Sequence, residues 1–489
     1  MSTIPHINLC IIQPPGYVHS LGFLDQARFF RHQFRRMGAT VTLSKNRLQH
    51  EAVNVVFGAH LGFDANLTQR YTCLFVNLEQ LGDGGAKVSE SYLKLLSQSA
   101  VVDYDADNVP AYTTYIEDVP IVPFLYAPYL KPARTVPLSQ RPIDVLFIGS
   151  MNDRRRDMLK RIEATGAKVV TFDSPLYGPE RDQFIMQAKC VFNAHFYASS
   201  RFEQARVSHC LSLGTPVVSE RSELAKPHAA FENSVFWVRE PELEDFFANQ
   251  FGTPAFYDAA EVALSRFESV DPVEDYADVL AFAAGYAQIH QARRSQDAWR
   301  PQRINLGSGK DYKLGWFNID ILDRAQPDLL LDLGQPVQWP FQASTQQAGQ
   351  VLLEPGTVEL IYANNVLEHV PDLPQLMTNC LDLLKTGGQF LVEVPFEHAA
   401  TAWQDPTHVR ALNEKSWLYY ADWFWYLGWF EHRFSVDQFQ YLDDKLKECE
   451  RGQAAFMRVL LTKVETSMKE RNAARVMRPD FCLADDVDE

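Results

Sequence analysis

"RINLGSGKDYKLGWFNID", residues 303–320, contains the turn that decides the fold of the C-terminal part of this chain. A short apolar run enters a Gly-x-Gly turn at Gly307 and Gly309, and the next apolar run ends on an acidic residue, Asp320. A glycine turn after a strand lets the backbone approach a nucleotide-like cofactor closely, and an acidic residue at the end of the second strand accepts from ribose hydroxyls. We therefore expect a cofactor site at this turn.

The spacing distinguishes two classes of cofactor. The dinucleotide fingerprint has a third glycine, where this chain has Tyr312, and an acidic residue about 20 residues after the first glycine. Asp320 follows Gly307 by only 13 residues. A pyrophosphate also needs the N-terminus of a helix at the turn. S-adenosylmethionine has no phosphate and needs close approach of the backbone to its amino-acid part, so the pattern favours S-adenosylmethionine.

Three downstream segments extend the pattern: "DLLLDL" (328–333), "VELIYANNVLEHVPDL" (358–373) and "LDLLKTGGQFLVEVP" (381–395). Together with the turn they resemble the class I S-adenosylmethionine-dependent methyltransferases over roughly residues 303–465. The resemblance implies a cofactor turn at Gly307 and Gly309, a ribose contact at Asp320, a position near the adenine for Asp332, and a substrate or cofactor contact at Asn364. One departure is Asn305, where the family often has a carboxylate.

The segment after the fifth strand, "EHAATAWQDPTHVRALNEKSWLYY" (397–420), is similar to the Asp-Pro-x-His-x-Arg segment of methyltransferases found near polysaccharide genes. The resemblance implies that His408 takes a proton from an acceptor hydroxyl and that Asp405 orients it; an Asp-Pro turn with a capping histidine is the alternative. The pair could also bind a metal, but a third ligand is not evident, so no metal is expected.

Residues 417–430 are strongly aromatic, since nine of these fourteen residues are Trp, Tyr or Phe. One interpretation is a helix packed under the sheet. The other is that some of the rings stack on sugar rings or bases, because aromatic faces suit both.

The first 300 residues alternate strand-like and helix-like segments in two series, separated by the proline-rich stretch 129–142. Such alternation predicts doubly wound parallel sheets, and two series with a linker predict two facing lobes. The segment "NAHFYASSRFEQARVSHCLSLGTPVVSE" (193–220) is similar to the donor-binding helix and strand of group 1 glycosyltransferases, which have the GT-B fold.

This second resemblance implies a nucleotide-sugar donor whose diphosphate is stabilised by cations. Arg206 precedes Gly214 by eight residues, as the family pattern requires, but His209 stands where that family has a ribose-binding glutamate. The residues assigned to the donor are Arg154, Arg155, Glu203, Arg206 and His209, and those assigned to acceptor-side catalysis are His60 and His195. The alternatives are a solvated helix face for the first arginines, an ion pair between Glu203 and Arg206, and structural histidines.

The sequence thus predicts an α/β chain with two Rossmann-like lobes followed by a class I methyltransferase domain. The predicted parts are residues 1–135 (GT-B acceptor lobe), 136–298 (donor lobe with a helical extension), 299–465 (methyltransferase domain) and 466–489 (acidic tail). The predicted function is a bifunctional enzyme of polysaccharide biosynthesis that adds a sugar and a methyl group to a glycan or glycoside acceptor.

Composition limits the alternatives. A formal net charge of −16 disfavours nucleic acid as a partner, and the chain has no run of about 18 apolar residues that could span a membrane. Seven cysteines without a Cys-x-x-Cys pair favour a reducing cytoplasm. Two other functions stay open: phage-type glycosylation and methylation of nucleic-acid bases, and a methyltransferase joined to a GT-B module that binds ligand without catalysis.

Overall fold

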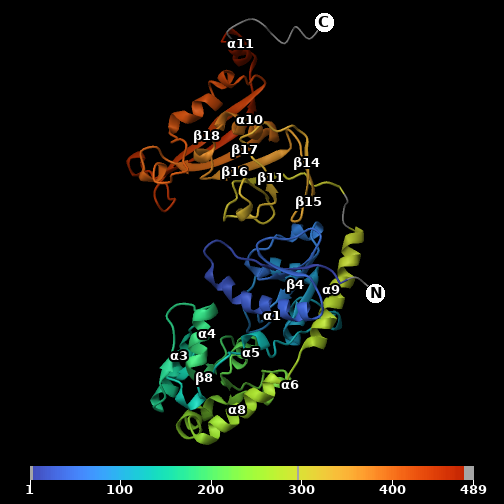
Figure 1. Ribbon diagram of the computed structural model, residues 1–489, viewed down its shortest axis with the longest axis vertical. Helices are drawn as coiled ribbons and strands as arrows, with labels where there is room; N and C mark the ends of the chain where they lie inside the picture. Colours follow the sequence, from blue (N-terminus) through green and yellow to red (C-terminus); the bar gives the residue numbers. More distant parts are fainter. Residues whose placement is uncertain (1–3, 294–296, 478–489) are drawn as a thin grey trace. The chain divides into compact units, whose positions relative to one another are not determined.

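Apolar runs form the interiors of three large β-sheets in the computed structural model, which describes residues 4–293 and 297–477 (Figure 1). The chain divides into unit 1, Met1–Leu48 with Ala52–Arg294, and unit 2, Gln49–Glu51 with Ser295–Glu489. Unit 1 contains two of the sheets and unit 2 the third. The protein therefore has an α/β fold with Rossmann-like parallel sheets.

The first sheet of unit 1 is entirely parallel, in the order β2-β1-β3-β4-β5. All residues of its three central strands are buried, which explains why those runs are continuously apolar rather than alternating. The elements are β1 (Ile7–Ile11), α1 (Phe23–Arg36), β2 (Val41–Lys45), β3 (Val53–Phe57), β4 (Cys73–Asn77), α2 (Glu90–Ser97) and β5 (Ala100–Asp103).

The second sheet of unit 1 is also parallel, in the order β10-β9-β8-β6-β7. Its strands are β6 (Ile143–Leu146), β7 (Val169–Val170), β8 (Ala188–Asn193), β9 (Val217–Glu220) and β10 (Phe236–Val238). Its helices are α3 (Asp153–Ala164), α4 (Gly178–Gln187), α5 (Gln204–Ser212), α6 (Ala229–Glu232), α7 (Leu243–Asp245) and α8 (Pro254–Glu268). Residues 129–142, predicted to be a linker, lie in the sequence between β5 of the first sheet and β6 of the second.

Helix α9 (Val273–Arg293) follows the second sheet in the sequence but packs on the first, against α1 and β3 (Figure 1). Its residues Tyr276, Val279 and Ala283 lie in the same hydrophobic core as Phe30 of α1. The sequence predicted this region as an extension of the donor lobe. The apolar periodicity of a helix records that one face is buried but does not record which partner covers it.

The sheet of unit 2 has seven strands in the order β13-β12-β11-β16-β17-β19-β18. Of these strands only β19 runs antiparallel to the others. The elements are β11 (Arg303–Leu306), β12 (Phe317–Asp320), β13 (Leu329–Leu330), β16 (Val358–Asn364), α10 (Leu373–Leu383), β17 (Leu384–Pro395), β18 (His432–Leu442) and β19 (Phe456–Glu465). A separate hairpin pairs β14 (Phe341–Thr345) with β15 (Gly349–Leu353).

The predicted acidic tail begins with a helix, α11 (Met468–Val476). Ser467 and Glu470 form a reciprocal capping box at its N-terminus, which satisfies backbone N–H groups that a helix otherwise leaves unpaired. The rest of the tail, residues 478–489, lies outside the described residues. None of the helices in the described ranges is long and apolar enough to cross a lipid bilayer.

Candidate functional site

The glycine turn of unit 2 joins β11 to β12 without a helix between them, since residues 307–316, all of which the structure describes, form turns and irregular loop. Gly307 and Gly309 have φ angles of +63° and +44°. A Cβ on Gly307 would lie 2.3 Å from Cγ2 of Val366, a residue just beyond β16. Glycine is therefore required at 307 both by the left-handed backbone and by close packing.

Asp320, the last residue of β12, holds this turn in place. Asp320 is buried, with 6% of the residue exposed. Its Oδ2 accepts from the Gly309 N–H at 2.7 Å, and its Oδ1 accepts from the Leu322 N–H at 2.8 Å. Each carboxylate oxygen has two lone pairs, so both keep acceptor capacity for a hydroxyl. The arrangement is compatible with the ribose contact predicted from the sequence.

Two further polar side chains brace the turn. Asn305, at the position where the family often has a carboxylate, donates through Nδ2 to the Asp311 carbonyl at 2.8 Å and to Asn318 Oδ1 at 2.9 Å. Its amide thus stabilises the loop itself. Ser308 Oγ, between the two glycines, is buried and has no hydrogen-bond partner among the described residues. Sequence reasoning did not single out Ser308, because a serine between glycines is common in plain turns.

The remaining predicted cofactor residues follow neighbouring strands. Asp332 lies just after β13, is exposed, and accepts from the Gly334 N–H at 2.8 Å; Asn364 is the half-buried last residue of β16. Strands β13, β12, β11 and β16 are adjacent and parallel, so their carboxyl ends meet at one edge of the sheet. The fold therefore brings the predicted cofactor residues to a common edge.

His408 faces a carboxylate other than the one predicted. Its Nδ1 lies 2.8 Å from the Ala402 carbonyl, and its Nε2 lies 3.9 Å from Oε1 of Glu368. Asp405 instead accepts from the N–H and the hydroxyl of Thr407 through Oδ1, at 2.8 and 2.7 Å. The Asp-Pro turn directs the Asp405 side chain onto its own backbone two residues on, as Asp side chains in turns commonly do.

Glu368 is buried, with 2% of the residue exposed, and neither carboxylate oxygen has a hydrogen-bond partner among the described residues. Burial raises the pKa of Glu368 to about 7, because desolvation penalises the charged form. His369 completes the cluster, with its ring centroid 4.7 Å from that of His408. Glu368 and His369 are adjacent in the quoted segment 358–373, but no spacing in the sequence shows that His408 meets them.

The aromatic segment forms two short 3-10 turns, Glu414–Tyr420 and Phe424–Leu427, rather than the single packed helix predicted from the sequence. Four rings, those of Trp417, Tyr420, Phe424 and Trp429, lie in the core of unit 2. Three others form an exposed group: Tyr419 contacts Trp423 and Tyr426 edge to face, at centroid distances of 5.2 and 5.6 Å. The segment thus divides between packing and surface.

Unit 1 contains a cavity of about 650 Å³ lined by loops and helices that follow strands of both its sheets. The segments after strands of the first sheet contribute His19 and Glu79 among others, and those after strands of the second contribute Gly149, Ser150, Arg155, Glu203 and Arg206. The volume is in the range of cavities that bind small molecules and cofactors. The cavity is thus lined from both sheets of unit 1, and the GT-B arrangement of these sheets stays a prediction.

Arginines flank a glutamate on the wall of this cavity. Arg155 Nη2 lies 2.7 Å from Glu203 Oε1, and Arg206 pairs with the same carboxylate. Burial lowers the pKa of Arg206 to about 9 and that of Arg155 to about 10. A Cβ on Gly149 would lie 2.5 Å from Arg206 Nη1, so the absence of a side chain at 149 lets the guanidinium approach the end of the strand.

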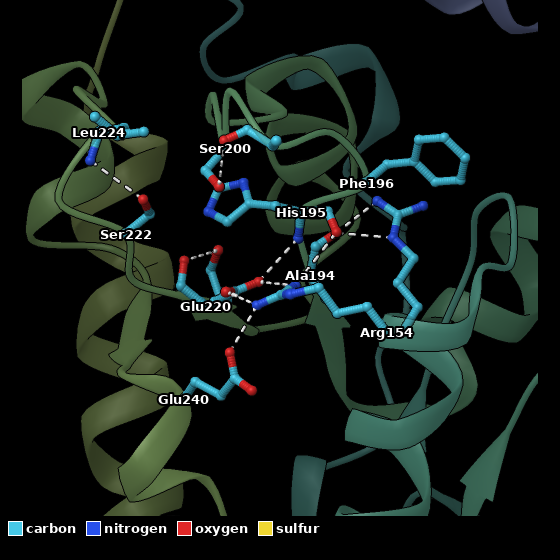
Figure 2. A network of polar contacts seen from close by, with 12 residues as sticks. Arg154, Ala194, His195, Phe196, Ser200, Glu220, Ser222, Leu224 and Glu240 are labelled. Carbon is cyan, nitrogen blue, oxygen red and sulfur yellow. Dashed lines mark hydrogen bonds and ion pairs between the residues drawn. The ribbon is translucent and has the colours of Figure 1, made fainter. Parts of the chain in front are cut away.

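Four predicted residues do not line the cavity. Arg154 pairs with Glu220 and, at 3.0 Å, with Glu240, as Figure 2 shows. His195 is buried, with Nδ1 3.1 Å from the Arg201 carbonyl.

The other two are His209 and His60. His209 Nε2 lies 2.8 Å from Asp182 Oδ1, away from the cavity. His60 Nε2 lies 3.5 Å from Oε1 of Glu79, a residue that lines the cavity. Burial lowers the pKa of His60.

The different positions of Arg154 and Arg155 follow from helix geometry. Residues next to each other on a helix point about 100° apart, which is why Arg155 reaches the cavity and Arg154 does not.

A family model described as a methyltransferase domain matches residues 131–439, which is more than half of the chain. The chain belongs to this methyltransferase domain family. The match begins ahead of β6 in unit 1 and ends within β18, so it includes the glycine turn, Asp320 and the cluster around Glu368. The methyltransferase sheet predicted from the turn at 307 therefore has independent support.

Other comparisons cover less of the molecule. This methyltransferase is 27% identical over 165 residues to "Uncharacterized protein L140" of Acanthamoeba polyphaga mimivirus, over 32% of this chain and 51% of that protein. The chain thus spans about half the length of the curated relative that it matches.

Among solved structures, similarity extends to an S-adenosylmethionine-dependent methyltransferase from Mesorhizobium loti (13% identity, 34% of this chain and 93% of that chain, TM-score 0.22). A second is an S-adenosylmethionine-dependent methyltransferase from Archaeoglobus fulgidus (11% identity, 36% and 91%, TM-score 0.22). The family match, and not these likenesses, identifies the methyltransferase domain.

Proposed function

We propose that unit 2 transfers a methyl group from S-adenosylmethionine to a hydroxyl of a glycan or glycoside. The observation that carries this proposal is the glycine turn after β11, closed by Asp320 from the end of β12, in a sheet of seven strands. When bound, S-adenosylmethionine supplies a methyl group on a sulfonium sulfur. The protein must then bind the cofactor, orient the acceptor and promote loss of the acceptor proton.

The residues present fit this cofactor. The space beside Gly309, where a Cβ would meet only the Gly307 carbonyl at 3.8 Å, leaves room for the amino-acid part, and Asp320 retains acceptor capacity on both oxygens for the ribose hydroxyls. Asp332 and Asn364 lie at the same edge of the sheet, where we propose contacts to the adenine and to the substrate or cofactor. The missing helix after β11 also favours a cofactor without a pyrophosphate.

We place the acceptor hydroxyl at the cluster of Glu368, His369 and His408. The Ala402 carbonyl can only accept, so His408 carries its hydrogen on Nδ1 and keeps a lone pair on Nε2. That nitrogen is free to take a proton from the hydroxyl. Asp405 acts at one remove, because it bonds Thr407, whose hydroxyl lies 3.0 Å from His369 Nδ1.

The exposed rings of Tyr419, Trp423 and Tyr426 support a sugar-containing acceptor. Sugar rings present C–H faces that pack on aromatic side chains, and these three rings offer exposed faces close to one another. A glycan chain of the O-antigen or capsule type would offer both a ring to stack and a hydroxyl to methylate.

We further propose that unit 1 is a GT-B glycosyltransferase that uses a nucleotide sugar. The supporting observation is the cavity of about 650 Å³ between its sheets, walled by Arg155, Glu203 and Arg206. A departing nucleoside diphosphate develops negative charge, which buried guanidinium groups stabilise. His60, paired with the cavity residue Glu79, is the acceptor-side candidate for proton transfer. We propose no role in transfer for His195, the other acceptor-side candidate, or for His209, which the sequence assigned to the donor, because neither lines the cavity.

Calorimetric titration of the full chain with S-adenosylmethionine and with nucleotide sugars tests both proposals separately. We expect each ligand to bind with one site per chain and without competition. Absence of S-adenosylmethionine binding would overturn the methyltransfer proposal. Binding of a nucleotide sugar without any hydrolysis or transfer would favour the binding-module alternative, and tight binding of DNA or RNA would favour the nucleic-acid alternative.

A further inference from the structure

Three side chains capable of binding a metal converge in unit 2 from segments far apart in the sequence. Glu368 and His369 belong to the 3-10 turn Leu367–His369 after β16, and His408 follows the Asp-Pro turn. One ligand atom from each side chain lies within 4.8 Å of the other two. The Val409 N–H donates to the Glu368 carbonyl at 2.9 Å, which fixes the two segments against each other.

The buried carboxylate of the cluster has a single ion-pair contact in the described part of the chain, with His408. Glu368 is 2% exposed, and neither oxygen forms a hydrogen bond within the described part of the chain. An unpaired buried carboxylate is costly, and a bound cation removes most of that cost. The nearest base, Nε2 of His408, lies 3.9 Å away, which is too long for a hydrogen bond.

Both imidazoles are held with Nε2 available. His408 Nδ1 donates to the Ala402 carbonyl, and His369 Nδ1 lies 3.3 Å from the Thr407 carbonyl and 3.0 Å from its hydroxyl. The Thr407 hydroxyl donates in turn to Asp405. Histidines that bind metals are oriented in this way, with the second ring N–H donated to a carbonyl or a hydrogen-bonded chain ending in a carboxylate.

We propose that Glu368, His369 and His408 bind a divalent transition-metal ion of the zinc class. Two imidazoles and one carboxylate suit zinc, cobalt, iron or manganese, whereas magnesium and calcium prefer sites made of oxygen. Ligand bonds of about 2.0–2.2 Å require ligand atoms roughly 3.3–3.5 Å apart, so the three side chains need to move inward by only about 1 Å. The sequence predicted no metal, because a third ligand beside Asp405 and His408 was not evident. The fold instead brings two other ligands, Glu368 and His369, to His408.

The ion would have open coordination positions, as catalytic metal sites with three protein ligands do. An acceptor hydroxyl bound there would lose its proton more readily, because a metal ion lowers the pKa of the oxygen that it binds. This role rests on the proposed methyltransferase function and changes His408 from a proton acceptor to a ligand. Metal binding itself does not depend on that function.

The test uses the full chain, stripped with a chelator, desalted and titrated with Co²⁺ and Zn²⁺ without S-adenosylmethionine or acceptor. We expect one ion per chain, with visible absorption bands of Co²⁺ in low coordination that Zn²⁺ abolishes. Glu368→Gln and His408→Ala should each eliminate these bands. Thr407→Val, which keeps all three ligands but removes a bond to His369, should weaken binding about 10–100-fold.

His398→Ala is the matched control, because His398 is an exposed histidine of the same unit outside the cluster. This variant should bind Co²⁺ and Zn²⁺ as tightly as the unmodified chain. Circular dichroism establishes whether each variant is folded. If a ligand variant does not fold, Thr407→Val still tests the site, because it keeps all three ligands. Absence of Co²⁺ and Zn²⁺ binding, or equal binding by folded ligand variants, would overturn the inference. Calorimetry with S-adenosylmethionine on the same samples tells a failure of the metal site from a failure of the proposed function.

Discussion

Polar side chains at the candidate sites are held by backbone groups as much as by one another. Asp320 accepts from two backbone N–H groups, and His408 donates to a backbone carbonyl, as does His195 behind the cavity-lining residues of unit 1. Such bonds fix which atom of the side chain remains available, because a carbonyl can only accept and an N–H can only donate. The chemistry of these residues therefore depends on where the neighbouring backbone runs.

We predict that Asp320→Ala reduces the affinity for S-adenosylmethionine by about tenfold to a hundredfold, since hydrogen bonds to charged groups contribute about 1.5–3 kcal/mol. The variant also frees the Gly309 N–H, so the turn should loosen while the sheet stays folded. Calorimetry measures the affinity. Asp323→Ala, which alters an exposed carboxylate just beyond β12, should bind like the unmodified chain, and equal affinity of the two variants would contradict the assignment.

A second prediction concerns pH and His195. Burial lowers the pKa of His195, an effect that the nearby Arg154 reinforces and Glu220 opposes. Because the folded-state pKa lies below the unfolded value of about 6.5, the stabilisation is present above that pH and is lost as the pH falls through the folded-state pKa.

His195→Asn keeps a donor near Nδ1 but cannot titrate. We expect the free energy of unfolding of unit 1 to fall less steeply between about pH 7 and pH 5 in this variant than in the unmodified chain. Calorimetric scans over this range measure the difference. Identical slopes in the two proteins would show that His195 does not contribute to acid sensitivity.

Two helices of unit 1 illustrate how elements act across the unit. Helix α5 carries Arg206 to the cavity wall, and α9 returns from the second sheet to fill the core of the first. Tyr276 of α9 packs its ring against those of Phe29 and Phe30, at centroid distances of 5.5 and 5.0 Å. The core of the first sheet is therefore completed by a helix that follows the second sheet in the sequence.

Arg206→Ala should weaken nucleotide-sugar binding by about tenfold or more, because a cation that would face the diphosphate is lost. Glu203 keeps its pairing with Arg155, so the variant should remain folded. Arg154→Ala is the matched control, since Arg154 pairs with Glu220 and Glu240 away from the cavity (Figure 2). Calorimetry that finds equal losses in the two variants would argue against a donor site at Arg206.

Tyr276→Ala should destabilise unit 1 by about 3–5 kcal/mol, the usual cost of removing a large buried aromatic side chain. Tyr276 is fully buried, whereas Ile289 on the same helix is 54% exposed. Ile289→Ala should therefore change stability by less than about 0.5 kcal/mol. Urea denaturation measures the free energy of unfolding of both variants. A small change in Tyr276→Ala, similar to that in Ile289→Ala, would mean that α9 is not part of the core of the first sheet.

At the scale of the whole molecule, the chain consists of two units with separate cores. The proposed nucleotide-sugar site uses residues of unit 1, and the proposed S-adenosylmethionine site uses residues of unit 2. A ligand that binds only the folded state of one unit stabilises that unit by mass action.

We therefore predict two calorimetric unfolding transitions. S-adenosylmethionine at about 100 times its dissociation constant should stabilise only the transition of unit 2, by about 2.7 kcal/mol, and a nucleotide sugar should stabilise only that of unit 1. Fragments 1–293 and 297–489 assign the transitions. If the second fragment binds S-adenosylmethionine only when the first is attached, the two sites are not independent.

The amino-acid sequence by itself determined the strand–helix alternation and the glycine turn at the predicted cofactor site. Gly307, Gly309 and Asp320 are close in the chain, and parallel strands place their carboxyl ends at one edge, so local pattern was sufficient. The doubly wound sheets followed from the same reasoning. The choice between a helix and 3-10 turns at residues 417–430 did not, because aromatic density indicates burial without fixing the backbone.

Tertiary structure alone decided which distant side chains meet. His408 faces Glu368 and His369 because the segment after β17 folds back over the turn after β16, and no spacing in the sequence records that contact. In the same way α9 covers the first sheet. Hydrophobic periodicity specifies that a face is buried, whereas the partner of that face, and the carboxylate that a histidine meets, depend on packing between segments remote in the chain.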